Sequence, residues 1–349
     1  MALQAAARII DANLNRAREA LRVMEEYARF ALDDASLSLA IKEARHDLAG
    51  CVPEEVAKLM ATGRDVAGDV GRELHTPAEA RRADVADVAV AAAKRLSEAL
   101  RAVEEYAKTV DAHFAAAVGG LRYRGYELER RLSVTCRARR RFGQVKLYVL
   151  LTEALCAAEW LETAEAVLAG GADCIQLREK HLVDRELLRR ANVLASLCRE
   201  RGALFIVNDR PDIAVLCNAD GVHLGQDDVG VAEARRITRP EMLVGLSTHT
   251  ASQVSAAADA SPDYLAVGPM FATDTKPSNS IAGPELLSEA RTITSLPLVA
   301  IGGVTADNAR TVLSAADCCL AVCSAVIAKA DPAAAVASLR AVIERQESA

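Results

Sequence analysis

The sequence predicts two unlike parts, an all-α domain followed by a parallel eight-stranded α/β barrel. Eight short apolar runs begin at residue 145 and alternate with amphipathic stretches of helical length, as repeated βα units do. The first 135 residues contain no convincing strand, and one helical segment there occurs twice. The chain has 349 residues, enough for two domains of ordinary size.

The first part, assigned to residues 1–140, is predicted to be helical except for a loop-rich interval at Ala61–Pro77. The segment Asn15–Arg29 aligns with Lys94–Lys108 at an offset of 79 residues, from position 15 to position 94. Two copies of a helical hairpin would bury their apolar stripes against each other in a pseudo-symmetric bundle. The same offset pairs Arg45 with Arg124.

Charged residues are repeated as well, and two interpretations remain open. One is a solvated helix face with ion pairs three and four residues apart. The other is a charged cleft between the two copies, in which Arg45 and Arg124 face an anion. The repeated pairs are Arg16/Arg95, Glu19/Glu98, Arg22/Arg101, Glu25/Glu104 and Glu26/Glu105.

A long helix is predicted over Leu121–Arg141, with Gly143 as its stop signal. Its basic end, Arg137–Arg141, is expected to be exposed at the domain junction and to complement the helix dipole.

The second part, residues 144–346, is predicted to be the (β/α)8, or TIM, barrel. Gly170 and Gly171 end its first helix, and Pro284 lies in the first turn of a later one. The predicted strands are Val145–Thr152, Cys174–Glu179, Leu204–Asp209, Gly221–Gly225, Met242–Ser247, Tyr264–Pro269, Pro297–Gly303 and Cys318–Val326.

Composition excludes several classes of protein. The formal net charge of −6 argues against nucleic-acid binding, which needs a basic surface. Charges interrupt every apolar run before it reaches transmembrane length, so no membrane association is expected. The nine cysteines form no CxxC pair and no zinc-type spacing, which indicates buried free thiols in a reducing compartment. With no signal-peptide pattern at the N-terminus, we expect a cytoplasmic protein.

Polar clusters follow the predicted strands at their C-terminal ends, where parallel barrels hold their active sites. After the second strand, alternation places Gln176 and Arg178 on one face, and Lys180 follows. A guanidinium fork and a mobile ammonium group suit phosphate oxygens. The alternative is an exposed basic rim without a ligand.

Carboxylates follow the third and fourth strands. Asn208 and Asp209 end the third, and Asp227 and Asp228 come after the fourth. Carboxylates beside a diphosphate suit Mg²⁺, which takes one or two of them and shares phosphate oxygens. The alternatives are an Asx-turn for Asp209 and a helix N-cap for Asp227 or Asp228.

The remaining clusters favour a second phosphate. A polar loop, Thr273–Lys276, follows the sixth strand. Gly302-Gly303 and Cys323-Ser324 end the last two strands, the usual phosphate site of such barrels. His223 and His249 are predicted to be packed, hydrogen-bonded residues rather than bases.

Taken together, the segments QLREK, VND, DGVHLGQDD, GLSTHT, GPMFATDTK and AIGGV closely resemble thiamine-phosphate synthase over about 180 residues. The resemblance implies that hydroxymethylpyrimidine diphosphate is joined to thiazole phosphate, giving thiamine phosphate and diphosphate. It implies catalytic roles for Lys180, Lys276, Ser247 and Arg178, and Mg²⁺ ligation by Asp209 and Asp228. The pyrimidine diphosphate would be held by Gln176, Arg178, Lys180, Asn208 and Lys276, with Ser247 in the pyrimidine pocket. The thiazole phosphate would be held by Thr273, Thr275, Gly303, Cys323 and Ser324, and Cys323 departs from the aliphatic residue usual there.

The N-terminal part, including Asp11–Arg18, resembles a helical domain fused to such synthases in some bacteria. That domain is assigned as a hydroxymethylpyrimidine phosphate kinase, which implies ATP as a further substrate. No GxxxxGK[ST] phosphate loop is present. Candidate phosphate contacts are Asn13, Asn15, Arg16, Arg45 and Arg124, and the Arg64–Gly71 loop offers Asp65 and Asp69 to a metal.

Two alternatives stand beside this interpretation. The barrel could be that of a thiazole tautomerase-like enzyme, which would need no diphosphate–Mg²⁺ site. The helical part could be a non-catalytic interaction module. A homo-oligomer is expected, although no sequence feature sets its order.

Overall fold

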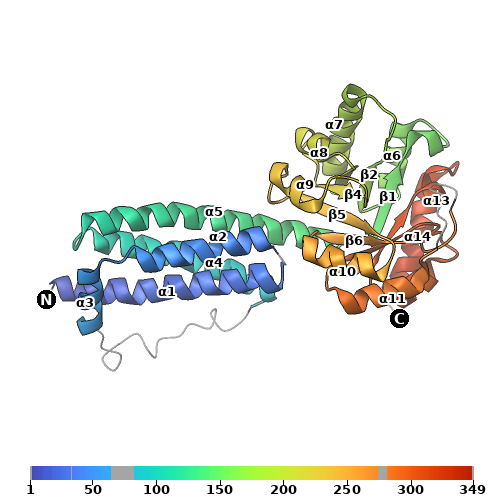
Figure 1. Ribbon diagram of the computed structural model, residues 1–349. Coiled ribbons are helices and arrows are strands. Elements are labelled where there is room, and N and C mark those ends of the chain that lie inside the picture. Colours follow the sequence, from blue (N-terminus) through green and yellow to red (C-terminus); the bar gives the residue numbers. More distant parts are fainter. Residues whose placement is uncertain (1, 33, 64–81, 274–280, 348–349) are drawn as a thin grey trace. The chain divides into compact units, whose positions relative to one another are not determined.

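The computed structural model describes residues 2–32, 34–63, 82–273 and 281–347 (Figure 1). It divides into two compact units, Met1–Cys136 and Arg137–Ala349, and the division falls within one long helix. The boundary expected between residues 140 and 144 lies a few residues beyond it. Each unit has a hydrophobic core of its own.

The first unit is a helical bundle in which α1, α2, α4 and α5 lie side by side (Figure 1). The apolar positions of the repeat, such as Leu14 and Leu96, are fully buried, as their helical spacing predicts. Its helices are α1 (Ala2–Phe30), α2 (Ala35–Gly50), α3 (Glu54–Gly63), α4 (Val85–Ala107) and α5 (Ala112–Phe142).

Two helix boundaries differ from the prediction. Ala61–Gly63 belong to α3, because the helix continues until it reaches a glycine, and residues 64–77 of the predicted loop lie outside the described residues. The long helix predicted from Leu121 begins earlier, at Ala112, and ends at Phe142, directly before Gly143.

The two copies of the hairpin do not keep one offset, and this corrects the predicted pairing of Arg45 with Arg124. Asp34 caps α2 by accepting from Leu37 N at 2.8 Å, and Asp111 accepts from Phe114 N at 2.8 Å in the same way. These two caps are 77 residues apart, not 79, because α4 ends two residues earlier in the repeat than α1 does, while the turns that follow the two helices are equally long. Arg122 is therefore the structural counterpart of Arg45.

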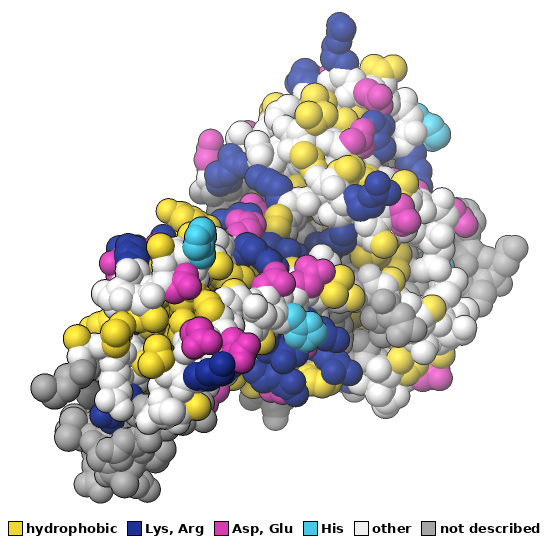
Figure 2. All heavy atoms as spheres, turned by 60° about the vertical axis from the view of Figure 1, so that its left-hand side comes forward, with side chains coloured by type: hydrophobic (Ala, Val, Ile, Leu, Met, Phe, Trp, Pro, Cys, Tyr) yellow, Lys and Arg dark blue, Asp and Glu magenta, His cyan; other side chains and the backbone are white. Residues whose placement is uncertain are grey.

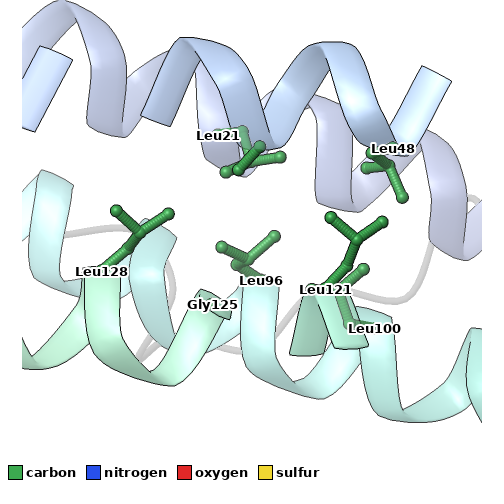
Figure 3. A pocket seen from close by; sticks show the side chains of 8 residues that line it. Leu21, Leu48, Leu96, Leu100, Leu121, Gly125 and Leu128 are labelled. Atoms are coloured by element: carbon green, nitrogen blue, oxygen red, sulfur yellow. The ribbon is translucent and has the colours of Figure 1, made fainter. Parts of the chain in front are cut away.

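The shifted register also explains a small apolar void of about 10 Å³ in the bundle (Figure 3). Gly125 of α5 takes the place that Leu48 has in α2. The void is lined by Leu21, Ala44, Leu48, Leu96, Leu100, Leu121, Gly125 and Leu128.

The second unit is a closed barrel of eight parallel strands in sequential order, as predicted. All eight strands fall within the predicted runs except β5, which extends one residue further. They are β1 (Leu147–Leu151), β2 (Cys174–Leu177), β3 (Leu204–Asn208), β4 (Gly221–Leu224), β5 (Leu243–Thr248), β6 (Tyr264–Val267), β7 (Leu298–Ile301) and β8 (Cys319–Val322).

Helices surround the barrel (Figure 1). Gly170 caps the first of them, and Pro284 lies in the first turn of α11, both as predicted. A short 3-10 turn, η2 (Glu153–Leu155), follows β1. The helices are α6 (Trp160–Ala169), α7 (Asp184–Arg201), α8 (Pro211–Leu216), α9 (Val231–Ile237), α10 (Ala251–Ala260), α11 (Gly283–Ile293), α12 (Ala309–Ala315), α13 (Ser324–Ile327) and α14 (Pro332–Glu347).

The C-terminal end of α5 closes the N-terminal mouth of the barrel. Phe142 is 2% exposed and stacks on Tyr264 of β6, with ring centroids 4.2 Å apart. Arg139 Nε donates to buried Asp263 at 2.8 Å, and Arg235 also bonds to that carboxylate. Burial alone would raise the pKa of Asp263, but the two guanidinium charges outweigh it and lower the pKa. The basic run is thus a helix C-terminus as predicted, but Arg139 is an anchor and not an exposed residue.

On the face drawn in Figure 2, Lys and Arg side chains are interspersed with Asp and Glu side chains. This agrees with the many ion pairs, of which Arg22–Glu26 and Arg101–Glu105 are exposed examples on the helical unit. Of the helices in the described residues, none combines the length and the apolar character that crossing a membrane requires.

Candidate active site

The parallel strands bring the predicted polar residues to one end of the barrel. Gln176 lies on β2, Asn208 ends β3, and Ser247 lies near the end of β5. Arg178, Lys180, Asp209, Asp228, Gly303, Cys323 and Ser324 follow the C-terminal ends of their strands, and Thr273 lies on the segment after β6. Thr275 and Lys276, predicted to contact phosphate, lie outside the described residues.

Three charged side chains meet beside β3 and β4. Lys180 Nζ lies 3.1 Å from Asp209 Oδ2, and the carboxyl group of Asp228 is near enough to act on the pKa of Asp209. Burial, followed by the neighbouring carboxyl group of Asp228, raises the pKa of Asp209, and Lys180 opposes the rise. Two carboxyl groups therefore lie near each other, beside one lysine that is half exposed.

The backbone fixes the orientation of these carboxylates. Asp209 has a positive φ of 61° and donates its N–H to His223 O at 2.8 Å. Asp228 Oδ2 accepts from Gly225 N at 2.7 Å, which tightens the turn after β4. Asp228 does not cap α9, since Gly230 holds that position. Asp227, the neighbouring candidate, is exposed.

Arg178 and Glu179 are consecutive but have different surroundings. Glu179 accepts from Glu153 N at 2.6 Å and lies 3.9 Å from Arg190, so its carboxylate serves the packing of α7. Arg178 is half-buried, and its guanidinium forms no ion pair with any of the described carboxylates. Arg178 is close enough to Cys323 for its charge to act on the thiol, whose pKa burial raises to about 11. A half-buried cation without a carboxylate partner suits an anionic ligand better than an exposed rim.

The turn after β7 lies closely against the segment that follows β6. Gly302 and Gly303 both have positive φ, 98° and 67°. A Cβ on Gly302 would lie 2.6 Å from Pro269 Cβ, so this backbone needs a residue without a side chain. Asn308 Nδ2 donates to Gly303 O at 2.9 Å and holds the turn, while Cys323 and Ser324 begin α13.

Sequence reasoning missed a chain of buried hydrogen bonds inside the barrel. Gln176 Nε2 donates to Tyr148 OH at 2.8 Å, and Tyr148 OH lies 3.2 Å from Tyr264 OH. Tyr264 OH lies 3.1 Å from His223 Nδ1, and His223 Nε2 lies 2.9 Å from Ser247 Oγ. Burial lowers the pKa of His223 to about 4, so the ring is neutral, as expected of a packed core histidine. The available signal was two tyrosines at inward-facing strand positions, where their hydroxyls need partners.

In the helical unit, both candidate anion-binding arginines carry carboxylate partners. Arg45 Nε donates to Glu25 at 2.9 Å, and Arg124 bonds to Asp47. The repeat-related pair is Arg122 with Glu104, at 2.5 Å.

The other helical candidates are bonded locally or fall outside the description. Asn13 donates to Ile9 O, Arg16 donates to Asn13, and Asn15 accepts from Arg18. The Arg64–Gly71 loop, with Asp65 and Asp69, lies outside the described residues, and the described part of the chain holds no cluster of three potential metal ligands.

A closed parallel barrel with charged and polar groups gathered at the C-terminal ends of its strands defines the class, an enzyme of the (β/α)8 type. Residues 147–326 match the family model for thiamine monophosphate synthase, and residues 8–131 match the ThiD2 family. A thiamine-phosphate synthase of Synechococcus sp. strain WH7803 is 40% identical over 334 residues, covering 94% of each chain. The chain belongs to the thiamine-phosphate synthase family, and it is a transferase of thiamine biosynthesis.

Two further comparisons agree. A thiamine-phosphate synthase of Thermosynechococcus vestitus is 41% identical over 334 residues, covering 95% of this chain and 93% of that one. The solved structure of a thiamine phosphate pyrophosphorylase from Pyrococcus furiosus is 35% identical, with a TM-score of 0.55. It covers 60% of this chain and 98% of its own, so the likeness is to the barrel.

Proposed function

We propose that the barrel joins an aminopyrimidine carrying a methylene diphosphate to a thiazole phosphate, releasing diphosphate and forming thiamine phosphate. Departure of diphosphate leaves a benzylic-type cation that the ring amino group stabilises, and the thiazole nitrogen attacks it. The protein's part is to position both substrates and to stabilise the charge that develops on the leaving group.

The proximity of Lys180, Asp209 and Asp228 supports this proposal most strongly, and Arg178, after the same strand as Lys180, forms no ion pair with a described carboxylate. Arg178 and Lys180 would hold the diphosphate, with Asn208 and the undescribed Lys276, while Gln176 and Ser247 would line the pyrimidine pocket. The glycine turn after β7, with Cys323 and Ser324, would receive the thiazole phosphate. A tautomerase-like barrel has no need of this cluster.

The two carboxylates fit a magnesium ion. Burial raises the pKa of Asp209, and the neighbouring carboxyl group of Asp228 adds to the rise. A cation bound by both carboxylates would remove the repulsion between them. Bound Mg²⁺ would supply charge neutralisation to the departing diphosphate. Gly225 N, donating to Asp228 at 2.7 Å, keeps one oxygen of that carboxylate in place.

The test of the site compares adjacent aspartates. Asp228→Asn and Lys180→Ala should each lose at least about a hundredfold in kcat/KM, as removal of a charged transition-state contact does. Asp227→Asn, which changes the exposed neighbour, should keep wild-type activity. Near wild-type formation of thiamine phosphate by both site variants would refute the assigned roles.

We propose further that the helical unit phosphorylates the pyrimidine monophosphate and so supplies the barrel's substrate. The match of residues 8–131 to the ThiD2 family supports this proposal. ATP would then be the phosphate donor in the reaction of the helical unit, giving the pyrimidine diphosphate and ADP. The nine free thiols support a reducing compartment, and we propose the cytoplasm.

The kinase proposal can be tested on the full chain. With ATP, Mg²⁺, pyrimidine monophosphate and thiazole phosphate, wild type should form thiamine phosphate. The Lys180→Ala variant should accumulate pyrimidine diphosphate, because only the barrel is disabled. Formation of thiamine phosphate from the diphosphate but not from the monophosphate would show that the helical unit is a non-catalytic module.

A further inference from the structure

The buried hydrogen-bond chain crosses the barrel from Gln176 on β2 to Ser247 on β5. We name it the relay: Gln176, Tyr148, Tyr264, His223 and Ser247. Its first four side chains are at most 6% exposed, while Ser247 is half-buried at the end where the candidate site lies. Gln176 Oε1 is buried and has no hydrogen-bond partner among the described residues.

Counting hydrogens gives the relay a direction. Because Gln176 Nε2 donates to Tyr148, the single hydroxyl hydrogen of Tyr148 is left for the oxygen of Tyr264. Tyr264 then donates to His223 Nδ1. A neutral imidazole that accepts at Nδ1 carries its hydrogen on Nε2, so His223 donates to Ser247 Oγ.

The opposite direction leaves a hydrogen without a partner. If Ser247 donated to His223, and His223 to Tyr264, then Tyr264 would donate to Tyr148. The Tyr148 hydrogen would then find no acceptor, since the Gln176 group beside it is a donor. A buried donor without a partner is unfavourable.

We infer that the relay couples the two ends of the pyrimidine pocket, so that Gln176 presents an acceptor while Ser247 presents its hydroxyl as a donor. Tyr148, Tyr264 and His223 are positioning residues that set this polarity without contacting substrate. An acceptor paired with a donor matches a heterocycle that carries an amino group beside a ring nitrogen. The oxo analogue, which has an acceptor in place of the amino group, would oppose Gln176 Oε1. This inference rests on the proposed function and adds the origin of its specificity for the aminopyrimidine.

The barrel interior is shaped to hold the relay. Gly245 of β5 leaves the space that Tyr264 fills, because a Cβ there would lie 2.4 Å from the tyrosine oxygen and 2.1 Å from Cζ. Phe142 stacks on the Tyr264 ring from the N-terminal mouth. Burial raises the pKa of both tyrosines well above the usual value, so their hydroxyls keep the hydrogens that the relay needs.

The test removes one hydroxyl from the middle of the relay and a matched one outside it. Tyr264→Phe should raise KM for the aminopyrimidine diphosphate about tenfold and leave KM for the thiazole phosphate unchanged. Its preference for the amino over the oxo substrate should fall by at least about tenfold. Thr248→Val is the control, since Thr248 is fully buried on β5 and donates to Ala266 O outside the relay. It should keep both KM values and the preference.

Two further measurements protect the interpretation. Tyr148→Phe should show the same rise in KM and the same loss of preference as Tyr264→Phe. It replaces Tyr264→Phe in the test if the Tyr264→Phe protein does not fold. In a Ser247→Ala background, Tyr264→Phe should cause a much smaller loss of preference than it does alone. Unchanged preference in a folded relay variant, or an equal loss in Thr248→Val, would overturn the relay. Wild type that forms no thiamine phosphate would instead refute the proposed function.

Discussion

Gly125→Ala should stabilise the helical unit, because this glycine faces the void of the bundle. An added Cβ would lie 3.4 Å from Leu100 Cδ1 and 3.6 Å from Leu96 Cδ2, which is ordinary van der Waals contact. Alanine is favoured over glycine inside a helix by about 1 kcal/mol. Burying one methyl group adds about 0.8 kcal/mol. The free energy of unfolding should therefore rise by about 1.5–2 kcal/mol.

Gly120→Ala is the matched control on the same helix. Gly120 is exposed, and nothing lies within 4 Å of the position of its Cβ. It gains the helix propensity alone, about 1 kcal/mol. The difference between the two variants therefore measures filling of the void.

Urea unfolding of the intact chain provides the assay. Circular dichroism follows both units, whereas the fluorescence of the single tryptophan, Trp160, follows the barrel alone. The transition of the helical unit should move to higher urea, and the Trp160 transition should stay in place. A Gly125→Ala protein no more stable than Gly120→Ala would refute the reasoning.

Three further predictions concern the barrel. Asp263→Ala should lower the free energy of unfolding by about 3–5 kcal/mol, while Asp317→Ala at an exposed ion pair should change it by less than about 1 kcal/mol. Burial would raise the pKa of Asp263, but two arginines outweigh it and lower the pKa. The stability that the Asp263 carboxylate contributes is therefore present above its unfolded-state pKa and is lost as pH falls through its folded-state pKa. Denaturation measured at a series of pH values should show the stabilities of wild type and Asp263→Ala converging in acid. Burial and Asp228 raise the pKa of Asp209, so, as pH is lowered, its protonation should weaken Mg²⁺ binding at a higher pH than protonation of an ordinary aspartate would. Calorimetry at a series of pH values measures this affinity, and an affinity that stays constant down to the pKa of an ordinary aspartate would contradict the prediction. Gly302→Ala meets Pro269 and should abolish activity and lower stability, whereas Gly202→Ala, with positive φ but open space, should cost about 1 kcal/mol and keep activity.

Local sequence determined the architecture of the barrel. Its strands are buried on both faces, so each one is a continuous apolar run that can be recognised by itself, and Leu204–Asn208 is an example. The end of each apolar run marks the end of a strand, so the polar residues that follow it, such as Asp209 and Arg178, can be identified from the sequence as well. Parallel strands carry these residues to one end of the barrel, so the sequence alone predicts which residues surround the site.

Only the tertiary structure decided which side chains meet. The sequence offset of 79 paired Arg45 with Arg124, but α4 ends two residues earlier in the repeat than α1 does, and this gives Arg122 the role instead. Tyr148 and Tyr264 lie 116 residues apart, and their contact depends on barrel closure. Periodicity reports which face a residue occupies, whereas a hydrogen-bond partner across a barrel is set by strand register and packing. For that reason the sequence by itself determined the family and the polar residues at the strand ends, whereas only the tertiary structure decided the hydrogen-bond partners of the buried relay.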